Sequence, residues 1–223
     1  MLLSCPAGFA TSCAMLEPSE IEPLFTRKDG SFVFARWDRP IVPVIFGVDD
    51  TTLPALKGAL EAVVTLAGHK MSDVDVELGA NLMMFFVSDW AELSGVPNLE
   101  RLVPDLAPLL DRLQAAEANQ YRIFRFDEAG TIRAAFVFVR MDQHLAEVSA
   151  ETLALSQAVQ VILLWSDAAF AETSPLLAGP KGDVMLRPEF GALVRAAYDP
   201  VLPPVSRDPA LAYRLSARMG RTA

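Results

Sequence analysis

Apolar side chains after residue 52 recur at the spacing of one face of an α-helix. They are Leu53, Leu56, Leu60, Val63, Val64 and Ala67. The polar run Asp49–Thr52 precedes this stripe and Gly68 follows it, and both features are typical of helix ends. The pattern predicts an amphipathic helix over residues 53–67.

Four other stretches have the composition of β-strands. Ile41–Val48 is rich in β-branched residues, and its Pro43 is tolerated only near an edge or a bulge. Residues 81–87 are apolar on both faces, which is typical of a central strand. The runs 121–126 and 131–139 flank the turn sequence Asp127–Gly130, so they predict a hairpin.

The side-chain period of a strand also predicts the faces of the second hairpin strand. Ile132, Ala134, Phe136 and Phe138 alternate along it, and a period of two places them on one face. We expect that face to pack on the core helix, with Arg133 pointing outward.

Two further helices follow the hairpin. Ser149 is a suitable N-cap, and Ala150–Leu164 is apolar around nearly its whole circumference, as a buried helix is. Leu186–Tyr198 is a shorter amphipathic stretch that Pro188 can begin. The pattern therefore predicts a central buried helix and a second, shorter amphipathic one.

Residues 89–119 interrupt this succession between the central strand and the hairpin. Pro97, Pro104 and Pro108 divide the segment, so it predicts two or three short helices instead of one long helix. We interpret it as an inserted cap over the sheet whose leucines and Val96 pack inward. We also expect it to be the most mobile part of the domain, because short helices make few long-range contacts.

The order of these elements predicts an α+β domain with a mixed β-sheet and helices packed on one face. The domain is expected to span residues 32–215, including the helical insertion at 89–119. Residues 1–31, with acidic residues and prolines over 17–23, predict an extended N-terminal segment. Residues 216–223 read as a basic C-terminal tail.

Composition narrows the functional classes. In 223 residues, 52% hydrophobic content supplies a core and argues against disorder. A formal charge of −9 is the wrong sign for holding a nucleic-acid backbone. Two histidines and two cysteines leave little material for a multi-ligand zinc site, so we expect no metal and no cofactor. No apolar run reaches the length of a transmembrane helix.

The amino terminus allows three interpretations. Residues 1–6 have no basic region and no long apolar run, so as written they are not a signal peptide. Residues 2–5 resemble a bacterial lipobox, in which Cys5 would be lipidated if translation began upstream of Met1. Free thiols, or a disulfide between Cys5 and Cys13, are the other two interpretations.

Polar side chains interrupt the buried helix at Ser156, Gln157 and Gln160. At 100° per residue the three lie within one arc of the helix. Burying an amide without a partner costs about 1–3 kcal/mol, so these groups need partners. They either form a satisfied hydrogen-bond network in the core or line the floor of a cleft.

Three stretches resemble an uncharacterised family of alphaproteobacteria, the domain-of-unknown-function family numbered 2927, whose members are usually exported. The first is Arg36–Ile41 with the helix ending at Thr65–Gly68, and the second is Ser156–Gln160 with Trp165–Asp167. The third and most specific is Leu193–Leu202. The resemblance spans roughly residues 32–215, without a counterpart for the 89–119 region.

The resemblance implies a zincin-like metallopeptidase scaffold without its chemistry. Zincins carry His-Glu-x-x-His on the active-site helix, where two imidazoles bind zinc and the glutamate is the base. Family members tend to show Glu-Glu-x-x-Gln there, and this chain has Ser156, Gln157 and Gln160. An amide accepts no proton near neutral pH, and neither serine nor glutamine is a good zinc ligand. The implied function is a catalytically inactive domain that binds a peptide or protein partner, in the periplasm or at the cell envelope.

Two alternatives stay open from the sequence. A divergent hydrolase could use Asp142, His144 and Asp167 without zinc, since Asp142 could orient His144 as a general base. No nucleophile motif of the Gly-x-Ser-x-Gly type accompanies these residues. A structural envelope protein is the other alternative. His144 and Asp167 join the helix residues as cleft candidates, and an open cleft would favour binding. The sequence does not predict the oligomeric state.

Overall fold

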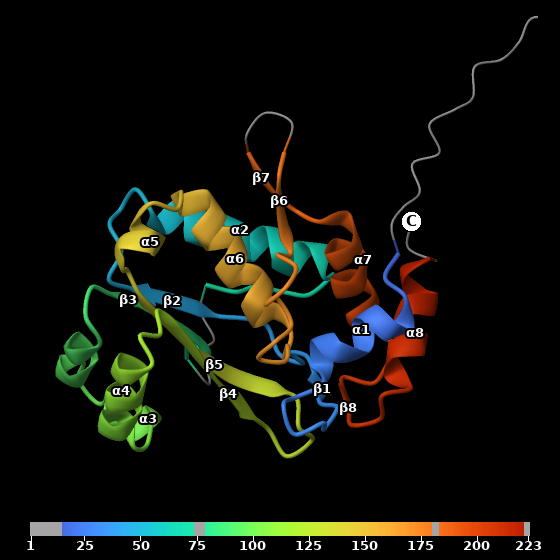
Figure 1. Ribbon diagram of the computed structural model, residues 1–223, viewed down its shortest axis with the longest axis horizontal. Helices are drawn as coiled ribbons and strands as arrows, with labels where there is room; N and C mark the ends of the chain where they lie inside the picture. The colour runs from blue at the N-terminus through green and yellow to red at the C-terminus, as the bar shows by residue number, and fades with distance from the viewer. Residues whose placement is uncertain (1–14, 74–78, 180–182, 221–223) are drawn as a thin grey trace, which may run out of the picture.

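A four-stranded mixed β-sheet lies at the centre of the molecule (Figure 1). The computed structural model describes residues 15–73, 79–179 and 183–220, and it is a mixed α/β structure. The strands follow the order β2-β3-β5-β4, in which β2–β3 and β3–β5 are parallel and β4–β5 is antiparallel. Their bounds are Pro43–Phe46 for β2, Leu82–Val87 for β3, Gln120–Phe126 for β4 and Ile132–Arg140 for β5. The predicted mixed sheet is confirmed.

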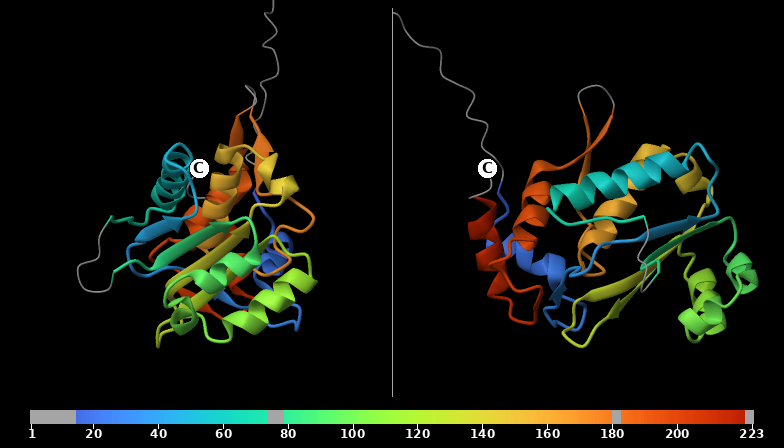
Figure 2. Two further views of the ribbon diagram at one scale, coloured as in Figure 1. Left: turned by 90° about the vertical axis from the view of Figure 1, so that its left-hand side faces the viewer. Right: turned by 180° about the vertical axis from the view of Figure 1, so that it is seen from behind.

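Two helices cover one face of this sheet. They are α2 (Leu53–Leu66) and α6 (Ala150–Ile162), which pack against each other and lie on the same side in every view (Figures 1 and 2). The predicted stripe of α2 is buried except for half-buried Leu53. The Ser149 side chain accepts from the Thr152 amide at the start of α6. The last helical residue of α6 is Ile162, two residues before the predicted end.

The opposite face is covered too, so the expectation of helices on one face only is wrong. The 89–119 insertion forms a 3-10 helix, η1 (Trp90–Gly95), and two α-helices, α3 (Leu99–Leu102) and α4 (Leu106–Ala115). Their apolar residues form a second core with Phe85 and Phe136 of the sheet. Because β3 and β5 are apolar on both faces, each face needs a cover. The insertion supplies the second one and buries its predicted apolar residues, except that Leu102 is 46% exposed and Val96 is only half-buried.

A register shift reverses the predicted faces of β5. Arg125 pairs with Ala134 and Phe126 with Ile132, so Arg133 is an extra residue on β5. Beyond a bulge of this kind, the residues that face the core change from even-numbered to odd-numbered positions. Ile132 lies in the core with α2 and α6 as expected, but Phe136 and Phe138 pack on the insertion instead. Arg133 is exposed, as predicted.

The first and the last helix of the described residues pack together beside the sheet. Residues 18–25 form the helix α1 (Pro18–Phe25), so the predicted extended segment is wrong there; Glu17 forms a capping box and Pro18 begins the helix. α1 packs on α8 (Leu211–Met219), which takes in residues 216–219 of the predicted tail. The remaining elements are β1 (Phe34–Ala35), α5 (Gln143–Ala146), β6 (Leu176–Ala178), β7 (Val184–Leu186), α7 (Pro188–Ala197) and β8 (Val205–Ser206).

Some predictions concern residues outside the described ranges. Cys5 and Cys13 lie there, so lipidation and a disulfide stay predictions. Among the helices that the structure describes, none has the length and apolar character needed to cross a bilayer.

Candidate binding cleft

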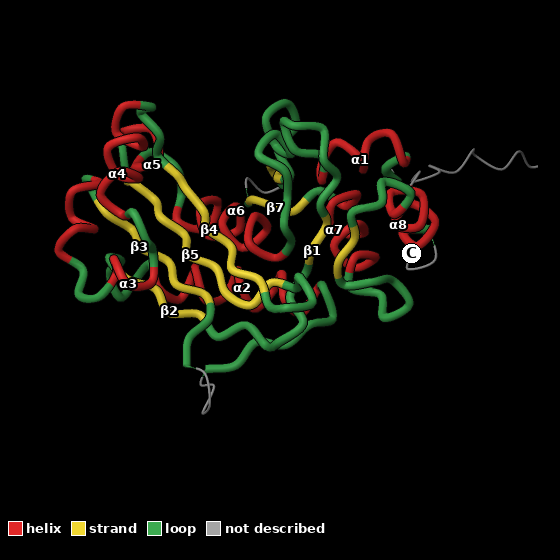
Figure 3. The backbone as a smooth tube through the Cα atoms, turned by 90° about the horizontal axis from the view of Figure 1, so that it is seen from below, coloured by secondary structure: helices red, strands yellow, loops and turns green. Residues whose placement is uncertain are grey.

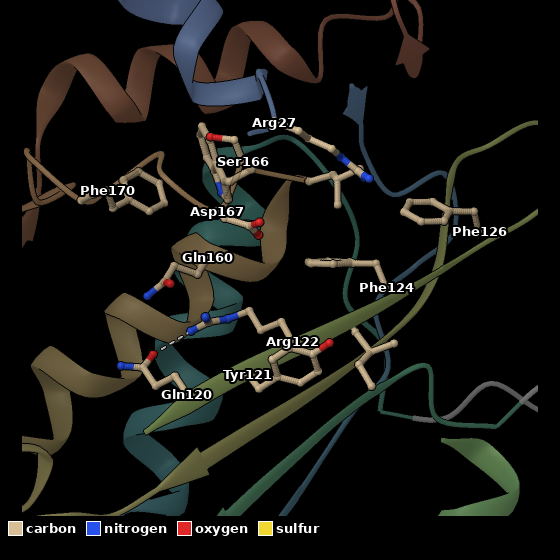
Figure 4. Close-up of a pocket in the computed structure, with 14 residues that line it drawn as sticks. Arg27, Gln120, Tyr121, Arg122, Phe124, Phe126, Gln160, Ser166, Asp167 and Phe170 are labelled. Carbon is tan, nitrogen blue, oxygen red and sulfur yellow. Dashed lines mark hydrogen bonds between the residues drawn. The ribbon is translucent and has the colours of Figure 1, made fainter. Parts of the chain in front are cut away.

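A cavity of about 660 Å³ lies between strand β4 and the segment that follows α6 (Figure 4). Strand β4 forms one wall along nearly its whole length. The other wall comes from the end of α6 and residues 164–171, and Arg27 lies at the rim. The lining residues are Arg27, Gln120, Tyr121, Arg122, Ile123, Phe124, Phe126, Gln160, Leu164, Trp165, Ser166, Asp167, Phe170 and Ala171.

Strand β4 is an open edge of the sheet (Figure 3). The Arg140 amide donates to the Asn119 carbonyl, which places Asn119, Tyr121 and Ile123 at the positions that bond to β5. Because antiparallel pairing alternates, the backbone groups of Arg122 and Phe124 point away from β5. Within the described residues no backbone partner is found for them. They are therefore free to pair with an added strand.

The opposite wall is held in place by contacts to α1. The Ser166 amide donates to the Leu24 carbonyl at 2.8 Å, and the Ser166 hydroxyl donates to the Pro23 carbonyl at 3.0 Å. The Trp165 ring stacks on Phe25, with 5.3 Å between ring centroids. Since this wall is bonded to α1 and packed on it, the shape of the cavity is formed before any ligand enters.

Aromatic donors fix the end of α6 itself. The last carbonyls of a helix have no partner within it. Three of them accept from aromatic side chains, each at 2.8 Å. The Trp37 indole N–H donates to the Val161 carbonyl, and the Trp165 indole N–H donates to the Val159 carbonyl. The Tyr198 hydroxyl donates to the Ile162 carbonyl. Burial raises the pKa of Tyr198 far above its ordinary value, so the hydroxyl remains a donor. The end of α6 is thereby connected to three separate parts of the chain.

A small polar network closes the cavity at the start of β4. Gln157 is fully buried, and its Oε1 accepts from Arg122 Nη2 at 2.7 Å while its Nε2 donates to Gln120 Oε1 at 2.9 Å. Arg122 Nη2 also donates to Gln120 Oε1 at 2.9 Å. Burial lowers the pKa of Arg122 to about 10, which still leaves the guanidinium charged at neutral pH.

The structure separates the three polar residues predicted on the helix. Gln160 lines the cavity, and its Nε2 donates to Ser156 Oγ at 2.9 Å. Ser156 and Gln157 do not line the cavity, and Gln157 belongs instead to the network with Arg122. The two interpretations of the polar arc thus apply to different residues: Gln157 is satisfied internally and Gln160 faces the cleft.

Asp167, also a predicted cleft residue, does lie in the cavity and is exposed. Figure 4 shows its carboxylate and the Phe124 ring directed toward the space between the walls, with Arg122 near Gln120. A second hollow, of about 500 Å³, adjoins the first at Arg27, which lines both. Arg27 is thus shared by the cleft and by a hollow beside α1.

The grouping of Asp142, His144 and Asp167 that the hydrolase alternative requires does not form. Asp142 caps α5, accepting from the Leu145 amide at 2.8 Å and from Asn119 Nδ2 at 3.0 Å. His144 is exposed on α5 and does not line the cavity. α5 precedes α6 and Asp167 follows it, so the 13 residues of α6 hold them about 20 Å apart.

The helix residues do not suit the zinc that a zincin scaffold implies. Gln157, at the position of the zincin glutamate, is bonded to the cationic Arg122. Neither Ser156 nor Gln160 offers an imidazole, and the described residues contain no group of three or more metal-ligating side chains. The side chains of Ser156, Gln157 and Gln160 therefore do not form a zinc site.

Comparisons with family models, with curated proteins and with solved structures find no match. The resemblance to the alphaproteobacterial family therefore stays a proposal, and so does the zincin-like assignment of the sheet and α6.

The sequence did not single out Gln120 and Arg122 as cleft residues. Arg122 alternates with aromatic residues, which predicts a half-buried strand and accounts for β4. Its role depends on Gln157, which is 35 positions away in the chain. A signal was present in the shared parity of Gln120, Arg122 and Phe124, because equal parity places them on one face of the strand.

Proposed function

We propose that this protein is a non-catalytic, metallopeptidase-like domain that binds a peptide in extended conformation along β4. The main support for this proposal is a cavity that follows the unpaired edge of a seven-residue strand. A peptide in this position would add a fifth strand, with backbone hydrogen bonds giving affinity and alternate side chains giving specificity.

The lining of the cleft supports a peptide more than a small, uniformly apolar ligand. Phe124, Phe126, Trp165 and Phe170 offer apolar surface, and Phe126 is 41% exposed. Asp167 and Arg27 place charges of both signs at the rim, and both are exposed. An extended peptide presents apolar and polar side chains alternately, which matches such a lining.

The cleft side chains also support binding without catalysis. The Ser166 hydroxyl donates to the Pro23 backbone carbonyl, and no hydrogen bond joins it to a carboxylate or an imidazole of the described residues. Gln157 cannot take a proton near neutral pH, and its carbonyl oxygen is already occupied by Arg122. No pair of cleft residues has the nucleophile and base geometry of a hydrolase. The resemblance to an exported family supports a place in the periplasm or envelope.

Peptide retention followed by amide hydrogen exchange tests this proposal. The immobilised protein is incubated with a pool of random hexapeptides, and mass spectrometry identifies the retained ones. With a retained peptide, the amides of Arg122 and Phe124 should exchange at least tenfold more slowly. Those of Tyr121 and Ile123, already bonded to β5, should change little and are the internal control.

Two results would contradict the proposal. One is that no peptide is retained, or that a retained peptide slows amide exchange only in residues away from β4. The other is the recovery of cleaved peptides, which would establish catalysis in place of binding alone.

A further inference from the structure

Arg122 is a cation without an anion. It forms no ion pair with any described residue, and the oxygens that accept from it belong to the neutral amides of Gln120 and Gln157. Its Nε is buried and has no hydrogen-bond partner. Arginines that are this deeply placed usually pair with a carboxylate or a phosphate, because an unpaired buried charge is costly.

The unused donor capacity of Arg122 lies on the cavity. A guanidinium has five N–H donors in a planar fork, and here one nitrogen, Nη2, bonds to the two glutamines. Arg122 lines the cavity, and its Nη1 has no hydrogen-bond partner among the described residues and, unlike Nε, is not buried, so an anion in the cavity can reach it. A carboxylate oxygen can accept a charge-assisted hydrogen bond from Nη1.

The cavity is closed where Arg122 lies. Gln157 Nε2 and Gln120 Oε1 bond across the gap between α6 and β4 at 2.9 Å. Gln120, the first residue of β4, and Gln160 are the first residues of their elements that line the cavity. The cavity therefore ends here, and a chain terminus suits this end better than an internal acidic side chain.

We propose that Arg122 binds the C-terminal carboxylate of the peptide at the closed end of the cleft. This inference rests on the proposed function. It also sets the direction of the ligand: with its terminus beside Arg122, the preceding residues run past Phe124 and Phe126 toward Arg27. The peptide is therefore antiparallel to β4, an arrangement in which the outward groups of Arg122 and Phe124 can both bond to it.

Two matched peptide pools test the inference. One contains random hexapeptides with free C-terminal carboxylates, and the other contains the same hexapeptides as C-terminal amides. Both pools include Asp and Glu at internal positions, so side-chain carboxylates are sampled in each. We expect the protein to retain the free-carboxylate pool at least tenfold more strongly, with no requirement for internal acidic residues.

Three variants connect that preference to Arg122. Arg122→Met removes the cation and should weaken binding of a selected carboxylate peptide by about 10- to 100-fold. Arg125→Met removes the same charge from an exposed arginine of the same strand on its other face, and binding should stay within twofold. Gln157→Glu leaves Arg122 in place but puts a carboxylate where Gln157 Oε1 now accepts, at 2.7 Å, and should weaken binding at least tenfold.

The outcomes separate the two proposals. Equal retention of both pools, or binding unaffected by Arg122→Met and Gln157→Glu, would overturn the carboxylate assignment and leave peptide binding standing. Retention of amides that contain Asp or Glu would assign Arg122 to a side chain and would also overturn it. Retention of neither pool would overturn peptide binding itself. Thermal melting of each variant identifies a folding defect, and Gln157→Glu keeps the test valid if Arg122→Met fails to fold.

Discussion

Single side chains on α6 have different roles although they are close in sequence. Gln157 bonds to Arg122 behind the cleft, and Gln160 bonds to Ser156 and lines the cavity. A carboxylate introduced at position 157 would face a cation, because Arg122 Nη2 lies 2.7 Å from the amide oxygen of Gln157.

The contact between Ser156 and Gln160 allows a metal-binding test. In the double variant Ser156→His, Gln160→His, two imidazoles lie one turn apart, where the present side chains already meet at 2.9 Å. We expect weak zinc binding. A free zinc concentration of ten times the dissociation constant would stabilise the fold by about 1.4 kcal/mol. Melting curves with and without zinc measure it. The control variant Ser156→His, Gln157→His, whose imidazoles diverge, should show no shift in melting temperature with zinc. Equal shifts in both variants would contradict the placement of positions 156 and 160 side by side.

His69 gives a prediction for pH. Burial lowers the pKa of His69 below its ordinary value, while the bond of Nε2 to the Arg39 carbonyl, at 2.7 Å, opposes that effect. The folded state thus holds the imidazole neutral at a pH where the unfolded chain already binds a proton. Unfolding free energy should therefore fall as pH decreases from about 7 to 5.

Denaturant titrations across this pH range test the effect. His69→Gln should flatten the dependence on pH. An equal slope in the parent and the variant would exclude His69 as its source.

At the level of elements, the sequence predicted most helices and strands but not all of their partners. The stripe of α2 and the hairpin were found because their signals are local and periodic. The bulge at Arg133 was missed, since one extra residue leaves the alternation looking regular until the partner strand is known. The helix α1 was missed because prolines and acidic residues masked the apolar spacing of Ile21, Leu24 and Phe25.

Phe136 tests the corrected faces of β5. It is 4% exposed and packs with the insertion, so Phe136→Ala should cost about 3–5 kcal/mol in unfolding free energy. Phe136→Leu should cost less, because more of the volume is kept. Amide exchange in the alanine variant should speed up in α4 before α6. A cost under about 1 kcal/mol, or faster exchange in α6 first, would contradict this packing. The greater mobility of the insertion itself stays a prediction for the same measurement.

For the whole molecule, the mixed sheet could be predicted and the location of the cleft only in part. Gln160 and Asp167 were predicted as cleft residues, and both line the cavity. The edge of β4 was not predicted, because an edge depends on the spatial order of strands and not on any one strand's composition. Helices on both faces were missed for a similar reason: periodicity shows that a strand is buried on both faces but not which segment covers it.

Tyr198 tests how the segment that follows α7 is connected to the centre of the molecule. Its hydroxyl bonds to the Ile162 carbonyl from beyond α7, and Tyr198→Phe leaves that carbonyl without this donor. We expect a loss of about 1–3 kcal/mol and one cooperative unfolding transition, measured together by far- and near-ultraviolet circular dichroism. Tyr213→Phe, at a side chain 66% exposed, should change stability by less than about 0.5 kcal/mol. Two separated transitions in the parent would show that this segment unfolds independently.

The three tryptophans of the chain occupy three different environments. Trp37 is buried with α2 and α6, and Trp90 is buried in the second core, between the insertion and the sheet. Half-buried Trp165 lines the cavity. Each can be replaced by phenylalanine in turn, so the protein contains an intrinsic optical probe for each side of the sheet and for the cleft. A ligand that fills the cavity should shift the emission of Trp165 and leave the other two unchanged, and stopped-flow fluorescence could then follow its entry without any added label.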